Sequence, residues 1–242
     1  MNGIELSARF GLPPNSKKYC GRREFAGIFA AYLKRKNTAN LRALKKALTH
    51  FHAHYSYLKL IAAANGKKPF DPEVTEALWL GNGLLKRVKR EDLQKLMLRD
   101  FCGKRMLSAE RAEKLAAGLP GGFVPHHSFH VFYVHSITDA VPPTVSTSDN
   151  CRVSWGKAVK VGKDAVIVET RKLARKREKL VLLPTLKRWK TSCAGIRLLP
   201  NVKPGDIVAA HWGVAVMKIS KGQAKALERA TKQNIRAANR QQ

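Results

Sequence analysis

The chain has 242 residues, with 46 Lys and Arg against 17 Asp and Glu, which gives a formal net charge of +29 at pH 7. Hydrophobic residues make up 44% of the sequence, yet no stretch approaches the roughly 20 uninterrupted apolar residues that a membrane-spanning helix needs. The four cysteines are widely spaced and form no Cys-x-x-Cys pair, so the pattern indicates neither a disulfide framework nor a four-cysteine zinc site. The start of the chain lacks the features of a secretory signal, and we expect a soluble cytoplasmic protein with free thiols and no membrane contact.

The excess of positive charge is uneven along the chain. Residues 1–150 carry a net charge of +12, and the shorter segment 151–242 carries +17. Such a surface attracts polyanions such as nucleic acid, and it also suits the docking of an acidic protein partner.

Apolar residues recur at helical spacing through residues 1–120, which predicts a mostly α-helical region. Asp71 followed by Pro72 is typical of a helix start, with the aspartate as N-cap and the proline in the first position. The predicted helices lie at 23–36, 40–65 (as one helix or a broken pair), 71–88, 90–101 and 108–119.

Histidines cluster in the segment 123–137, whose β-branched and aromatic residues fit either a strand or a short buried helix. In either geometry two imidazoles among His126, His127 and His130 converge, which predicts a second, weaker metal site. The alternative for these histidines is a buried polar cluster between the two halves of the chain. A further group, His50, His52 and His54, does not share one face of a continuous helix, so we favour it less as a site.

The spacing of apolar residues changes near residue 150, from a helical period to the alternation of β-strands. Residues 139–150 are rich in Pro, Ser and Thr and are predicted to be a linker. Strands with alternating apolar residues are then predicted at 152–161, 164–173 and 178–186, with one or two more in 201–220. Ser220 and Gln223 form a capping box that begins a C-terminal helix. We therefore predict an α+β fold, with a helical domain at 1–140 that carries the His-rich segment, and a small β-barrel with a C-terminal helix at 150–242.

An ordered set of residues in this second part carries a resemblance to a known family. Cys151 is followed by Gly156, Lys157 and Val159, then by the Pro204-Gly205-Asp206 turn, and then by His211-x-Gly213-x-Ala215. This set resembles the HypC/HupF family of hydrogenase assembly chaperones, which are small barrels with a C-terminal helix. The whole chain resembles an uncharacterised microbial family that joins a helical region to a HypC-like module.

The resemblance implies a role for two residues. In that family the matching cysteine and histidine are implicated in holding an iron that carries cyanide and carbon monoxide, on its way to the large subunit of a nickel-iron hydrogenase. Carried over, these residues are Cys151 and His211. The resemblance thus implies iron as the cofactor or cargo, and the hydrogenase large subunit or other maturation proteins as partners. A thiolate and an imidazole are suitable donors for such an iron.

Three functional readings follow. We prefer an accessory protein for metallocentre assembly that uses Cys151 and His211. The alternative is an RNA- or ribosome-associated module, in which the basic runs 171–179 and 186–190 track phosphates and Trp189 stacks on a base. The third is an enzyme with Cys20 as nucleophile. No Ser/His/Asp or His-Glu-x-x-His pattern supports this third reading, so we expect a chaperone or binding protein rather than an enzyme.

Overall fold

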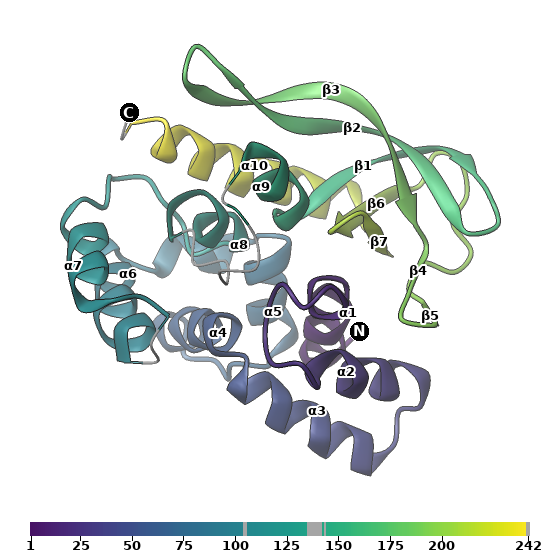
Figure 1. Cartoon of the computed structure of the whole chain (residues 1–242), viewed down its shortest axis with the longest axis horizontal. Coiled ribbons are helices and arrows are strands. Elements are labelled where there is room, and N and C mark those ends of the chain that lie inside the picture. Colours follow the sequence, from purple (N-terminus) through teal and green to yellow (C-terminus); the bar gives the residue numbers. More distant parts are fainter. Residues whose placement is uncertain (104–105, 135–141, 143, 241–242) are drawn as a thin grey trace.

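The N-terminal part of the chain is helical, as its periodicity predicts (Figure 1). This computed structural model describes residues 1–103, 106–134, 142 and 144–240. The α-helices of this part are α1 (Gly3–Ser16), α2 (Phe25–Lys34), α3 (Thr38–His50), α4 (His52–Ala64), α5 (Pro72–Trp79), α6 (Arg90–Lys95), α7 (Ala109–Ala117) and α8 (His127–Phe129). A 3-10 segment, η1 (Gly83–Arg87), and two π-helical segments, η2 (Leu96–Phe101) and η3 (His130–Val134), connect or extend them.

The helix starts follow the capping chemistry of the sequence. Asp71 holds the N-cap position of α5 and Pro72 the first helical position, but the Asp71 carboxylate accepts from the Lys68 amide and makes no capping hydrogen bond. The segment 40–65 forms the broken pair, because Phe51 has φ −81° and ψ 79°, outside the helical region, and so ends α3 and begins α4. The chain therefore changes direction between His50 and His52.

Helix α1 was not predicted from the sequence. Two prolines, Pro13 and Pro14, lie inside it, and proline disfavours a helix interior. Asn2 caps the helix by accepting a hydrogen bond from the Glu5 amide, and Leu6 and Phe10 are buried against the strands and the C-terminal helix. Tertiary packing therefore outweighs local propensity in this helix.

The His-rich segment is helical rather than extended. Its described part forms α8 and η3, and most of its side chains are buried. The predicted linker is partly helical as well, because α9 (Val145–Cys151) begins there with Thr144 as its cap. The rest of that linker, at 139–141 and 143, lies outside the described residues, as do the last residues of the His-rich segment.

The second part of the chain forms the predicted sheet and a C-terminal helix. The strands pair in the order β1-β2-β3-β7-β6, and β6 pairs in turn with β1, so the order is closed. Gly156 is needed in β1, because a Cβ there would lie 2.2 Å from the Glu169 carbonyl oxygen of β2. The elements are β1 (Ser154–Val161), β2 (Ala165–Lys176), β3 (Lys179–Lys190), β4 (Ser192–Cys193), β5 (Ile196–Arg197), β6 (Ile207–His211), β7 (Val214–Lys218) and α10 (Lys221–Ala238).

The apolar core joins the two parts. One buried cluster contains Leu6, Phe10 and Trp79 from the helices together with Ala209 and Leu227 from β6 and α10. In Figure 1, α1 lies beside β6 and β7, and α10 runs along one side of the sheet. The predicted change from helices to strands lies between α9 and β1. Residues before and after this change pack together in the same buried cluster. Among the described helices, none combines the length and apolarity of a membrane-crossing segment.

Candidate metal centre beside a cavity

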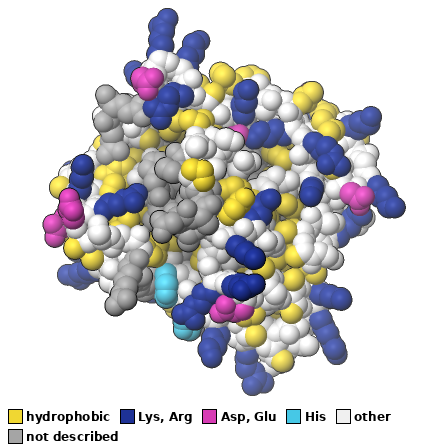
Figure 2. Space-filling view, viewed as in Figure 1, with side chains coloured by type: hydrophobic (Ala, Val, Ile, Leu, Met, Phe, Trp, Pro, Cys, Tyr) yellow, Lys and Arg dark blue, Asp and Glu magenta, His cyan; other side chains and the backbone are white. Residues whose placement is uncertain are grey.

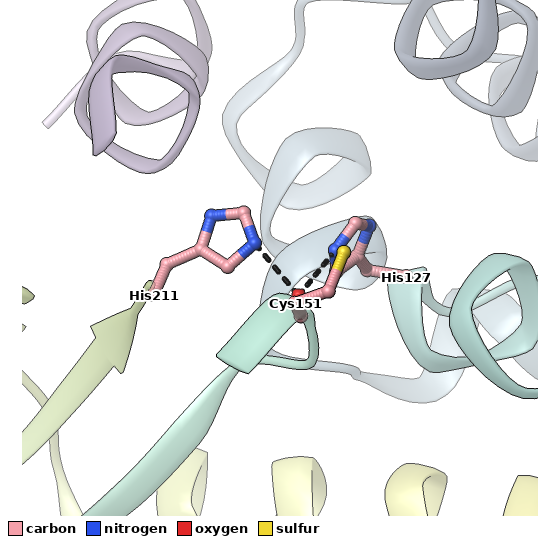
Figure 3. Close-up of side chains that lie close together, drawn as sticks. All are labelled: His127, Cys151 and His211. Carbon is pink, nitrogen blue, oxygen red and sulfur yellow. Dashed lines mark hydrogen bonds between the residues drawn. The ribbon is translucent and has the colours of Figure 1, made fainter. Parts of the chain in front are cut away.

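The structure brings Cys151 and His211 together and adds a third side chain, His127. One ligand atom from each of these residues lies within 4.8 Å of the other two (Figure 3). They come from the end of α9, the end of β6 and the start of α8. Residues 60 positions apart in the sequence thus meet because the sheet returns β6 beside the start of β1.

His211 is held rigidly at the end of β6. Its ring Nδ1 lies 2.7 Å from the Phe10 carbonyl oxygen of α1, and its Nε2 lies 2.7 Å from the Cys151 carbonyl oxygen. The chain then turns through Trp212 and Gly213, which have φ of 51° and 75° in the left-handed region. This tight turn fixes the end of β6, and the Trp212 amide donates to the Asn150 carbonyl.

The Cys151 carbonyl oxygen lies between two imidazoles. Figure 3 shows both rings directed at it, with His127 Nε2 at 2.9 Å and His211 Nε2 at 2.7 Å. Burial lowers the pKa of His211 to about 4, although its two backbone contacts act to raise it. Neutral His211 carries one N–H, so one of its ring nitrogens presents a lone pair to a carbonyl oxygen. In the tautomer with its proton on Nδ1, the lone pair is on Nε2, and that nitrogen is a potential metal ligand.

The Cys151 sulfur is a neutral thiol at pH 7. Burial raises its pKa well above the usual range, the nearby Cys20 raises it further, and the Trp212 side chain acts in the opposite direction. Cys151 is 3% exposed. A metal ion that binds this sulfur must therefore displace a proton.

A buried ion pair fixes the backbone around Cys151. Asp149 accepts hydrogen bonds from the Arg152 guanidinium at 2.9 Å and from the Leu173 amide of β2 at 2.7 Å. Lys187 of β3 also pairs with this carboxylate. Arg152 is 1% exposed and donates to the Arg171 carbonyl as well. These contacts attach the end of α9 to the sheet, so that the Cys151 carbonyl and sulfur have defined positions.

The other two histidines of the predicted second site have different partners. His126 accepts a hydrogen bond from the Ser128 amide on Nδ1, and its Nε2 lies 3.2 Å from the Trp79 carbonyl oxygen. His130 Nδ1 lies 3.3 Å from the Tyr57 hydroxyl. Among the described residues, His127 is therefore the member of the trio that joins Cys151 and His211. A second metal site among His126, His127 and His130 stays a prediction.

A cavity of about 460 Å³ adjoins the cluster. Its walls come from the loop after α1, from the α3–α4 junction, from the end of α5, and from α8 with Cys151. His50, His52 and His54 all line it. Sequence reasoning disfavoured these three because it treated their segment as one continuous helix, whereas the break at Phe51 lets all three reach the cavity. The sequence signal that could have indicated this site is the close spacing of three histidines, His50, His52 and His54, around Phe51.

His54 has an unusual environment for a polar side chain. It stacks between Phe51 and Trp79, with ring centroids 5.4 and 5.6 Å away. Burial lowers its pKa to about 3, and neither ring nitrogen has a hydrogen-bond partner within the described protein. A buried neutral imidazole with two unpaired nitrogens is costly unless it serves a ligand.

In the comparison with protein families, a single family model matches residues 1–242 and so spans both parts of the chain. The chain belongs to DUF6390, a family of unknown function. No curated protein and no solved structure matches it. Since the family description assigns no activity to this DUF6390 chain, its side chains are the basis for a functional proposal.

Cys20 lines the same cavity in this DUF6390 protein. Burial raises the pKa of its thiol to about 12, so Cys20 is a neutral thiol rather than an activated nucleophile. Cys193 is placed elsewhere, on β4, where its thiol lies 3.5 Å from the Ser16 hydroxyl. Among the described cysteines, Cys151 is the one that lies within 4.8 Å of two histidine nitrogens.

Proposed function

We propose that the protein is an accessory protein for metallocentre assembly that holds an iron-ligand unit at Cys151 and His211, with His127 as a third ligand, and hands it to a partner. The observation that supports this proposal is the buried cluster of one thiol and two imidazoles within 4.8 Å. The ordered residues that resemble the HypC/HupF family include two members of this cluster.

The donor set fits a metal ion of intermediate softness. Thiolate and imidazole are ligands for iron, zinc and copper, and the described cluster offers no carboxylate that would favour magnesium or calcium. Bonds of about 2.0 to 2.3 Å place ligand atoms about 3.3 to 3.8 Å apart in a tetrahedral site. Atoms that lie within 4.8 Å of one another therefore need to approach by at most about 1.5 Å.

The protonation of the cluster suits temporary binding. Burial keeps the Cys151 sulfur protonated in the free protein, so each metal ion competes with a proton for it. Metal binding through Nε2 of His127 or His211 would also require that nitrogen to leave the Cys151 carbonyl oxygen. Both costs weaken the complex relative to a site of preformed thiolates, and a carrier needs a complex that a partner can dismantle.

The identity of the cargo and partner follows from the resemblance. Cyanide and carbon monoxide on the iron would occupy coordination positions that three protein ligands leave open. The cavity beside the cluster provides space next to those positions. The acceptor would be the large subunit of a nickel-iron hydrogenase or another maturation protein, and the net charge of +29 would favour an acidic docking face on it.

The test is anaerobic purification of the full chain, followed by metal analysis and infrared spectroscopy in the cyanide and carbonyl stretch regions. We expect about one iron per chain with bands in both regions, and at least about a tenfold loss of iron in Cys151→Ala and His211→Phe. Cys193→Ala is the matched control, because it removes a partly exposed thiol from β4 and should leave the iron unchanged. Equal iron in the wild type and Cys151→Ala, with both proteins folded, would contradict the proposal.

A second candidate, nucleic-acid binding, is favoured by the outer part of the β2–β3 hairpin. Its residues 171–179 contain six exposed Lys and Arg and one Glu. One element of the sequence reading is wrong, however: Trp189 is 2% exposed and packs in the core of the sheet, so it does not stack on a base. In Figure 2, Lys and Arg are spread over the face of the molecule in view rather than gathered into one stripe. RNA binding whose affinity falls steeply with salt, and falls again in Lys172→Gln/Lys176→Gln, would support this candidate.

A further inference from the structure

The cavity beside the cluster has a distinctive charge pattern of its own. Among the described residues that line the cavity there is no Asp or Glu, but there are two arginines, Arg22 and Arg111. Both arginines are exposed, so they lie where the cavity meets the surface. Arg111 also donates to the Val134 carbonyl, which restrains its guanidinium. The entrance therefore favours a negatively charged group.

Deeper in the wall, two buried groups lack partners. The Trp79 indole N–H and both ring nitrogens of His54 have no hydrogen-bond partner within the described protein. Trp79 is 2% exposed and His54 is 5% exposed. An unpaired buried polar group costs about 1–3 kcal/mol, so two such side chains in one wall are expensive for the fold. An acceptor atom on a bound molecule would remove part of that cost by pairing with the Trp79 N–H or the single N–H of neutral His54, once a side-chain shift opens these atoms to the cavity.

The rest of the wall is aromatic. Phe51 and Tyr57 line the cavity beside Trp79, and aromatic walls favour a flat apolar body. The volume of about 460 Å³ lies in the range of small-molecule sites. A charged entrance, an aromatic middle and buried donors together describe a ligand with a defined chemistry.

We propose that this cavity binds a small organic anion with an aromatic body, whose carboxylate or phosphate meets Arg22 and Arg111 while a hydrogen-bond acceptor pairs with Trp79 or His54. The site does not need a bound metal. It is therefore separate from the proposed iron-carrying function, although the two sites adjoin at His127 and Cys151.

The experiment is calorimetric titration of the full-length protein, freed of metal by chelation, at about 0.15 M salt. The probes are benzoate, phenyl phosphate, the neutral benzyl alcohol and the cationic benzylamine. We expect saturable 1:1 binding of at least one anion, and at least about tenfold weaker binding of the neutral and cationic probes. The two anions distinguish a carboxylate ligand from a phosphate ligand.

Variants separate this site from general attraction to a basic protein. Arg111→Gln should weaken anion binding at least about fivefold, and Arg111→Lys should weaken it less, because the charge remains. His54→Phe keeps the aromatic stacking and should also weaken binding. Arg42→Gln removes an exposed arginine of α3 that does not line the cavity and should have no effect. His211→Phe should still bind the anion even though it loses the proposed metal site, because His211 does not line the cavity.

Three results would overturn the proposal. The first is the absence of binding by both anions. The second is equal binding of benzoate and benzyl alcohol, which would mean that the charge is not recognised. The third is an equal loss in Arg42→Gln and Arg111→Gln, which would mean that the net charge of the chain attracts the anion without a site.

Discussion

Two groups of buried polar side chains meet at the end of α9, and they are paired in opposite ways. On the sheet side, the Asp149 carboxylate has three partners: Arg152, Lys187 and the Leu173 amide. On the cavity side, His54 and Trp79 have buried nitrogens without partners in the described protein. Cys151 links the two groups. It lies in the chain between Asp149 and Arg152 of the first group, and it lines the cavity beside the second.

The difference teaches which polar groups serve the fold and which are available to a ligand. Satisfied buried charges stabilise a unique geometry, and removing one of them leaves its partner unpaired at high cost. Unsatisfied donors cost free energy in the isolated protein, so replacing them with apolar groups should cost little. Substitutions on the two sides should therefore change stability by very different amounts.

The largest effect is expected on the sheet side. Asp149→Ala leaves the Arg152 charge buried without its carboxylate and removes the acceptor of the Leu173 amide, so we expect a loss of about 3–5 kcal/mol in the free energy of unfolding. Urea denaturation would measure it. Glu73→Ala is the control, because it breaks an exposed ion pair with Lys67 and should cost less than about 1 kcal/mol. Equal losses in the two variants would erase the distinction between paired and exposed charges.

An intermediate effect is expected from the same change at two buried histidines. His126→Phe removes the acceptor of the Ser128 amide and the contact with the Trp79 carbonyl, and should cost about 1–3 kcal/mol. His54→Phe removes no hydrogen bond to protein and keeps the stacking between Phe51 and Trp79, so stability should stay equal or rise. Thermal and urea unfolding of the pair would test this. A larger loss in His54→Phe than in His126→Phe would contradict the assignment of His54 to ligand binding.

The last effect is absent at neutral pH and appears only on acidification, as the pH dependence that His54 contributes. Its pKa is lowered by burial from 6.5 to about 3, so the folded protein keeps it neutral while the unfolded chain takes up a proton below pH 6.5. The lowered pKa has no effect on stability above pH 6.5, and it destabilises the folded protein as the pH falls toward 3, by at most about 1.4 kcal/mol per pH unit. Unfolding curves between pH 7 and pH 4 should be less steeply pH-dependent in His54→Phe than in the wild type. Identical pH slopes would mean that His54 is not buried as a neutral group.

The sequence predicted much of the fold because its local signals are strong. Asp71 with Pro72 and the Ser220–Gln223 capping box mark true helix starts. The turn at 162–164 joins β1 to β2 as expected. Helix α1 escaped prediction, since its consecutive prolines oppose a helix locally and its burial against β6 and α10 depends on contacts about 200 residues away.

The site was predictable in part. The juxtaposition of Cys151 with His211 was expected from an ordered residue pattern, although metal binding there stays a prediction. The choice of His127 over its neighbours depends on which ring meets the end of α9, and spacing alone does not determine that. The contribution of His54 depends on the helix break at Phe51, a single backbone conformation that periodicity over 40–65 left open.

The contact between the His211 ring and the Phe10 carbonyl oxygen joins residues that are 201 positions apart in the chain. During synthesis, His127 and Cys151 are made well before His211. The Phe10 carbonyl of α1 therefore has its contact with His211 only after β6 has been made. A truncated chain, or a fragment that begins near residue 150, would therefore present the thiol without the complete ligand set. The three side chains of the proposed metal site therefore come together only in a chain that contains α8, α9 and β6.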